Sequence, residues 1–198
     1  MGRKANVMRS LKLVLLILVI FSILISGCLQ ENYGAQKNYS VQENHSSQRT
    51  YKTLSESQID QFLAGKNVTP LAIRTIENST VVLYETKLEM GIYRLSIDEN
   101  DKMSLTQISW QNNSAFTPVS IGGTATGIPF VTVIINDEQI LKKAYKAIVV
   151  FVNKDEVTEL VNNNKGIIIP DENIRNANVG WSSVTILDED DKVIFKKA

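Results

Sequence analysis

The sequence predicts a mainly β fold, an antiparallel β-sandwich or a partly closed barrel with one short helix at its N-terminal end. Three observations support this prediction. Apolar and polar residues alternate along several short segments, two apolar runs have the length of buried strands, and polar turn-forming residues separate the segments. Only one segment combines helical spacing with a helix-start signal. A fold built mostly from short strands follows.

The expected helix opens the folded region. Ser55 and Gln58 have capping-box spacing, and Gly65 is expected to end the helix. One helical face is apolar, with Ile59, Phe62 and Leu63. Three apolar anchors are few for a helix that binds a partner by itself, so we expect this helix to cover a β core.

The strand predictions follow from period-two patterns. A hairpin is expected around residues 77–80, and Pro170 is expected to end a strand. Five further segments have strand character: 93–97, 130–135, 148–152, 167–169 and 184–187. Residues 130–135 and 148–152 are apolar at nearly every position, which predicts central strands covered on both faces.

Two irregular features interrupt these patterns. Along Met103, Leu105, Ile108 and Trp110 the apolar parity changes once, which predicts a β-bulge at Thr106 or Gln107. The segment 121–127, IGGTATG, lacks the lysine and the spacing of a phosphate-binding loop and precedes a strand instead of a helix. We therefore expect a flexible loop at the rim of the sheet.

Two acidic segments resemble each other. IDENDKM, residues 97–103, and LDEDDKV, residues 187–193, each lie between two segments in which apolar and polar residues alternate. A calcium loop is one interpretation of the second, with Asp188, Asp190 and Asp191 as weak metal-ligand candidates. The spacing departs from that of calcium loops and there is no glycine for a sharp turn, so we expect two hairpin turns and no metal site.

The N-terminal segment has the layout of a secretory signal. A basic start is followed by an apolar run, residues 13–25, which is shorter than the roughly 20 residues of a spanning helix. The run ends in Ile25-Ser26-Gly27-Cys28, and Cys28 is the only cysteine. This tetrapeptide resembles the lipobox of prokaryotic lipoproteins. The resemblance implies a diacylglycerol on Cys28 and cleavage before it; an uncleaved signal anchor is the alternative.

Three regions result. Residues 1–27 are expected to be a lipoprotein signal peptide, and residues 28–50 a lipidated cysteine followed by a flexible tether rich in Gln, Asn and Ser. Residues 51–198 are expected to form a single β-rich extracytoplasmic domain, since that length supports one hydrophobic core. The expected location is the outer face of the cell membrane, with the lipid as anchor.

Charge and residue types exclude several functions. Of 21 basic and 21 acidic residues, four basic ones fall within the signal, so the mature chain carries 17 minus 21, or −4, and no basic cluster for nucleic acid. The single histidine, His45, lies in the tether, which excludes histidine-dependent triads and histidine-based metal sites from the domain. No cofactor is expected.

Two functional hypotheses remain. The first is a non-enzymatic binding or accessory module of the cell envelope, with a protein or a small ligand as partner. Aromatic residues at 93, 110 and 181 could serve it as a ligand platform, although aromatics in strand patterns are usually core. The alternative is a hydrolase of envelope glycans that uses turn carboxylates. Its candidates are Asp98, Asp101, Asp188 and Asp191.

Overall fold

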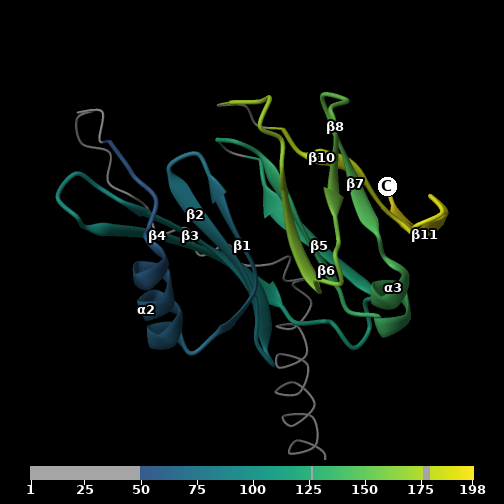
Figure 1. Ribbon diagram of the computed structural model, residues 1–198, viewed down its shortest axis with the longest axis horizontal. Helices are drawn as coiled ribbons and strands as arrows, with labels where there is room; N and C mark the ends of the chain where they lie inside the picture. The colour runs from purple at the N-terminus through teal and green to yellow at the C-terminus, as the bar shows by residue number, and fades with distance from the viewer. Residues whose placement is uncertain (1–49, 126, 176–178) are drawn as a thin grey trace, which may run out of the picture. The chain divides into compact units, whose positions relative to one another are not determined.

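Three antiparallel sheets make up most of the folded region. The computed structural model describes residues 50–125, 127–175 and 179–198, and these contain eleven strands and two helices (Figure 1). Sheet A has the order β1-β2-β3-β4, sheet B the order β5-β6-β9, and sheet C the order β11-β10-β7-β8. The mainly β prediction is confirmed, and within the described ranges each sheet keeps two edge strands, so no barrel closes.

The strand bounds are as follows. Sheet A contains β1 (Thr69–Ile76), β2 (Ser79–Glu85), β3 (Glu89–Ile97) and β4 (Met103–Gln111). Sheet B contains β5 (Val119–Thr124), β6 (Phe130–Ile135) and β9 (Gly166–Pro170). Sheet C contains β7 (Lys146–Phe151), β8 (Glu156–Leu160), β10 (Trp181–Leu187) and β11 (Val193–Lys197). The hairpin expected around residues 77–80 joins β1 to β2.

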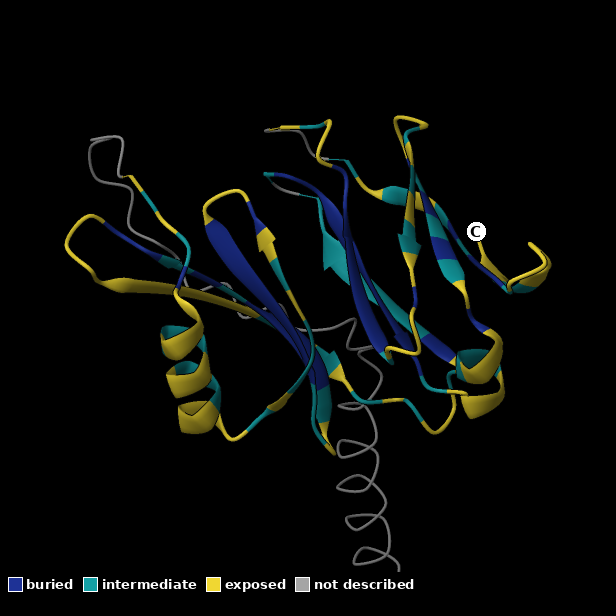
Figure 2. Cartoon of the chain, in the orientation of Figure 1, coloured by how far each residue is buried: buried dark blue, intermediate teal, exposed yellow. Residues whose placement is uncertain are grey.

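Sheet B is the middle layer of the core. One of its faces packs on sheet C through residues such as Val133, Val149 and Ile186, which we call the B–C core. Its other face packs on sheet A through residues such as Ile134 and Leu83, which we call the A–B core. Because both faces are covered, β6 is buried at all positions, as its continuous apolar run predicts (Figure 2).

Strand β7 does not follow the same rule. Its buried residues are Ala147, Val149 and Phe151, whereas the residues between them are only half-buried and Val152 is 63% exposed. The prediction that 148–152 is covered on both faces is therefore wrong. Sheet C is an outer layer, so only the face of β7 toward sheet B is covered, although β-branched residues occupy both faces.

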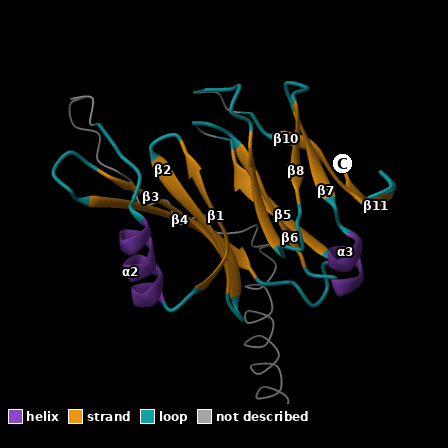
Figure 3. Ribbon diagram, viewed as in Figure 1, coloured by secondary structure: helices purple, strands orange, loops and turns teal. Residues whose placement is uncertain are grey.

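The predicted helix is confirmed as α2 (Glu56–Lys66), which Figure 3 shows beside sheet A. Ser55 Oγ accepts the N–H of Gln58, and the Gln58 side chain accepts the N–H of Ser55, so the capping box is complete. The helix continues past Gly65 to Lys66 and is capped by Asn67, whose φ of 53° is left-handed. Its apolar face covers the side of sheet A that points away from sheet B.

Strand β4 is regular where a bulge is expected. It pairs with β3 without a register shift from Glu89–Gln111 to Ile97–Met103, so the bulge prediction is wrong. Leu105 lies opposite Leu95 on the α2 side, whereas Trp110 packs into the A–B core on the other side. The parity changes because the two halves of β4 contribute apolar residues to opposite faces of sheet A.

The first four residues of the glycine-rich segment, 121–124, belong to strand β5 instead of a loop. Gly122 and Gly123 belong to β5, and a Cβ on Gly122 would lie 2.7 Å from Cη2 of Trp110. A Cβ on Gly123 would overlap the carbonyl oxygen of Phe130. These glycines therefore allow β4 and β6 to pack closely against β5.

Helix α3 (Glu138–Lys143) and strand β8 have no counterpart in the sequence predictions. Asp137 begins α3 by accepting the N–H groups of Gln139 and Ile140. In β8, Val157 packs on the B–C core and its neighbours are exposed, so the strand has one apolar anchor. Six residues and a single anchor are too short a pattern for either period to be recognised.

Candidate functional site

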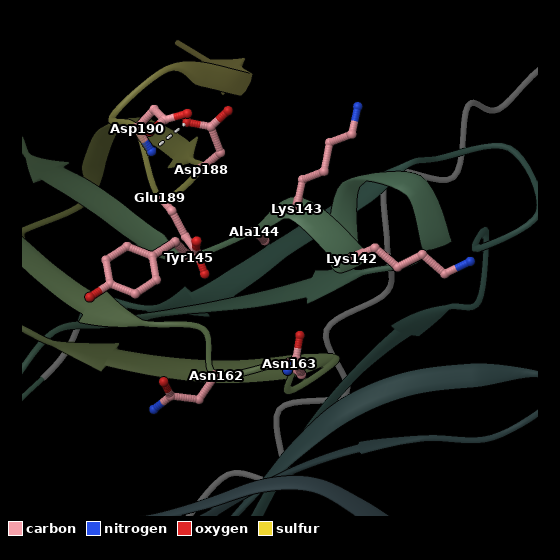
Figure 4. Close-up of a pocket in the computed structure, with 9 residues that line it drawn as sticks. All are labelled: Lys142, Lys143, Ala144, Tyr145, Asn162, Asn163, Asp188, Glu189 and Asp190. Atoms are coloured by element: carbon pink, nitrogen blue, oxygen red, sulfur yellow. Dashed lines mark hydrogen bonds between the residues drawn. The ribbon is translucent and has the colours of Figure 1, made fainter.

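An open polar pocket lies where α3, the β8–β9 turn and the β10–β11 turn meet. Figure 4 shows its lining, and its volume is about 450 Å³. Helix α3 contributes Lys142 and Lys143, which extend in different directions. The β10–β11 turn contributes Asp188, Glu189 and Asp190. We call this the end pocket; both signs of charge line it.

Local structure explains how the end pocket presents its charges. Ile140 and Leu141 pack against the B–C core, so the lysines that end α3 remain exposed. Ala144 follows them, and then Tyr145 is held between two strands: its N–H donates to the carbonyl of Leu187, and its own carbonyl accepts the N–H of Val161. Within the described ranges neither Lys142 nor Lys143 forms an ion pair, so both ammonium groups remain available to a ligand.

The asparagines of the end pocket belong to the β8–β9 turn. Asn162 and Asn163 have φ values of 49° and 60°, which few residues other than glycine, asparagine and aspartate adopt readily. Their presence in the turn is therefore explained by backbone conformation. Their amide groups add neutral donors and acceptors to the pocket.

The predicted β10–β11 turn holds its first carboxylate against the backbone. Asp188 Oδ1 accepts the N–H groups of Asp190 at 3.1 Å and Lys192 at 2.9 Å. Asp191 has a φ of 61°, and its carboxylate pairs with Lys146 at 2.6 Å. Thus Asp188 is bound to the backbone of its own turn, whereas Asp191 is paired with a lysine of β7. Among the residues that the structure describes, no three His, Cys, Asp or Glu side chains are arranged to hold a metal ion.

The β3–β4 turn has the same construction. Asp98 Oδ1 accepts the N–H groups of Asn100 at 2.9 Å and Lys102 at 2.8 Å. Asp101 has a φ of 59° and pairs with Lys52 at 2.7 Å. The lysines also correspond. The backbone of Lys52 forms a β-bridge with Ile97, the residue before the first turn, and that of Lys146 pairs with Leu187, the residue before the second. The two similar sequence segments are therefore two hairpin turns of equal geometry.

These two turns place the candidate acids in different sheets. Asp98 and Asp101 belong to sheet A, whereas Asp188 and Asp191 belong to sheet C, and sheet B lies between those sheets. A glycosidase needs its two carboxyl groups on either side of one bond. An aspartate of one turn and an aspartate of the other therefore cannot act together on one bond.

The aromatic residues considered for a ligand platform contribute to packing. Tyr93 is 4% exposed and stacks on Tyr84, with ring centroids 4.5 Å apart. Trp110 packs on the A–B core and Trp181 on the B–C core. They face different layers, so they do not form one platform.

A buried carboxyl group that sequence reasoning missed lies at the end of β9. Asp171 is fully buried, and its side chain faces Asp155 and Asn153 of the β7–β8 turn. Burial raises the pKa of Asp171, the N–H of Asn173 lowers it, the Asp155 carboxylate raises it further, and the Asn153 side chain lowers it in part. In the sequence, the run IIIPD at residues 167–171 indicates the end of a strand but does not indicate that Asp171 is buried. The facing turn comes from another sheet, so no local pattern could reveal the pair.

Comparisons with protein-family models, with curated proteins and with solved structures find no match to this chain. In the described part, no helix is both long and apolar enough to cross a membrane. The predicted lipidation residue Cys28, and the single histidine, His45, lie outside the described residues.

Proposed function

We propose that this protein is a lipoprotein held on the extracytoplasmic face of the cell membrane by a diacylglycerol on Cys28. The observation that carries the proposal is Ile25-Ser26-Gly27-Cys28 at the end of a basic and then apolar N-terminal segment. A diacyl group supplies two acyl chains, and two chains anchor a protein for long periods where one gives only marginal binding.

The role proposed for the folded domain is non-enzymatic binding of an envelope protein or a small ligand. The end pocket supports this role, because Lys142 and Lys143 carry no ion pair in the described ranges and acidic side chains stand across from them. Such a surface suits a polar partner that carries both charges. The alternative, a glycan hydrolase, has less support because its candidate acids belong to separate sheets.

Mass spectrometry of the protein produced with its own signal tests the anchor. The expected product begins at Cys28, carries the mass of a diacylglyceryl group and remains in the membrane fraction. Cys28→Ala is expected to lose the lipid mass. An unmodified thiol on a chain that keeps residues before Cys28 would reject the anchor.

Capture from membranes of the source cell tests the binding role. The charge-reversed double variant Lys142→Glu with Lys143→Glu is expected to lose partners that the unchanged protein retains. The matched control is Lys87→Glu with Lys102→Glu, because both lysines are exposed in turns of sheet A. Equal loss in both variants would argue against the end pocket. Glycan hydrolysis that Asp188→Asn abolishes would favour the alternative.

A further inference from the structure

Asp171 is directed into the space between two sheets. Ile167 and Ile169 of β9 face sheet C in the B–C core, and alternation along the strand puts Asp171 on the same face. Its N–H donates to the carbonyl oxygen of Pro129 at 2.9 Å, which continues the pairing of β9 with the segment before β6. The position of this side chain is therefore set by the sheet.

The same alternation brings Asp155 to face it from sheet C. Val157 of β8 packs on the B–C core, and Asp155 lies two residues earlier on the same side. The Asp155 carbonyl accepts the N–H of Phe151 at 2.8 Å, and the Asn153 Oδ1 accepts the N–H of Asp155 at 3.2 Å. Both the Asp155 carboxylate and the Asn153 side chain of this turn interact with Asp171.

One oxygen of Asp171 lacks a partner. Its Oδ1 accepts the N–H of Asn173 at 3.2 Å, whereas Oδ2 has no hydrogen-bond partner in the described part of the chain. Asp98 and Asp188 differ, because each has an oxygen that accepts two backbone N–H groups. Nor does any lysine or arginine of the described residues form an ion pair with Asp155 or Asp171.

A buried carboxylate oxygen without a donor is costly, and a second carboxylate facing it adds repulsion. Either a proton or a metal cation removes both costs. Asp155 is only half-buried and Asn153 is exposed, so a cation could enter through the β7–β8 turn. The donors are oxygen atoms, the ligands that calcium prefers, and calcium accepts waters and irregular geometry where magnesium requires a near-ideal octahedron.

We propose that Asp171, Asp155 and Asn153 bind a calcium ion between the end of β9 and the β7–β8 turn. Only two of these three ligands are charged, which is fewer than a tight calcium site contains. The expected dissociation constant is therefore about 1 mM, as in extracellular modules. The bound ion would link sheet B to sheet C at this end of the B–C core. The proposal does not depend on the lipid anchor or on the end pocket.

Thermal unfolding of the full chain in detergent, with and without calcium, measures the effect. At about 10 mM calcium and pH 7, a site of this affinity raises the Tm by about 4 °C relative to sodium chloride of equal ionic strength. Asp171→Asn and Asp155→Asn are expected to abolish the shift. Asp188→Asn is the matched control and is expected to keep it, since that aspartate lies in the β10–β11 turn.

Asp171→Asn carries its own check on folding. Because it removes a buried charge that has no ion bound, this variant is expected to be at least as stable as the unchanged protein without calcium. Terbium luminescence gives a direct readout of binding: Trp181 pairs with Phe151, next to the β7–β8 turn, and can sensitise a bound ion. The emission is expected to fall on addition of calcium and to be absent in Asp171→Asn.

Three results would overturn the proposal. The first is no calcium-dependent shift in the unchanged protein, and the second is a shift that survives in Asp171→Asn. The third is an equal shift with magnesium at the same concentration, which would indicate general screening of carboxylates. Loss of the shift in Asp171→Asn and Asp155→Asn but not in Asp188→Asn would establish the site.

Discussion

Arg74 and Glu159 connect the two outer layers of the sandwich. Arg74 Nη1 in β1 donates to Glu159 Oε2 in β8 at 2.7 Å, and the same nitrogen donates to the carbonyl oxygen of Ile168 in β9 at 3.0 Å. One guanidinium therefore contacts strands of all three sheets. Lys165, just before β9, pairs with Glu85 of β2 and adds a second link from sheet B to sheet A.

Removal of this link is expected to destabilise the fold. Arg74→Ala should lower the free energy of unfolding by about 1–2 kcal/mol, because it removes a charged hydrogen bond and leaves the Ile168 carbonyl without this donor. Urea unfolding measures this loss of unfolding free energy. The control is Lys52→Ala, whose ion pair with Asp101 is more exposed (62% and 76%) than that of Arg74 with Glu159 (32% and 35%). We expect less than about 0.5 kcal/mol for the control; equal losses would contradict the linking role.

Two glycines should respond to alanine in opposite directions. A Cβ on Gly91 would lie 2.7 Å from both the Ile108 carbonyl oxygen and the Tyr84 hydroxyl, so Gly91→Ala should cost about 2 kcal/mol through overpacking. A Cβ on Gly65, inside α2, would meet nothing within 4 Å. Gly65→Ala should therefore raise the free energy of unfolding by about 0.5–1 kcal/mol. Chemical denaturation of both variants compares them, and losses of similar size would refute the packing argument.

Tyr84 should make the fold sensitive to alkali. Burial raises the pKa of its hydroxyl, and the hydrogen bond to Glu89 raises it further. Because the folded pKa exceeds the unfolded one, stability is unaffected below about pH 10 and decreases as pH rises beyond it. Ultraviolet titration of the folded protein should show no phenolate from Tyr84.

Tyr84→Phe provides the comparison. This variant should give the same tyrosine titration as the unchanged protein while both remain folded, and should lose less stability above about pH 10. A smaller titration amplitude in Tyr84→Phe would mean that Tyr84 ionises in the folded state, against this prediction.

The stability of the two hairpin turns should depend on a side-chain oxygen that accepts hydrogen bonds, and not on its negative charge. Asp98→Ala removes the acceptor of two backbone N–H groups and should cost about 1–2 kcal/mol. Asp98→Asn keeps an oxygen in the same place and should cost less than about 0.5 kcal/mol. Asp188→Ala should resemble Asp98→Ala, since its turn has the same bonds. Thermal unfolding of the three variants decides this; a large cost for Asp98→Asn would show that the charge matters.

Sequence reasoning succeeded where the cause of structure is local. The capping box of Ser55 and Gln58 starts α2, and the paired segments 97–103 and 187–193 form hairpin turns. Each depends on bonds between residues at most four positions apart, which the sequence displays directly. The end pocket was not predicted, because α3 and the two turns that line it are far apart in the chain.

By itself, the sequence determined the β content, the N-terminal helix and the turns, since side-chain period and local hydrogen bonds depend on neighbours in the chain. The tertiary structure alone decided which strands are covered on both faces. It placed β6 in the middle sheet and β7 in an outer sheet despite similar composition. It also put the apolar residues of the two halves of β4 on opposite faces of sheet A without a bulge. It also brought Asp171 to face Asp155, because burial and the meeting of side chains depend on how sheets stack, which no single segment encodes.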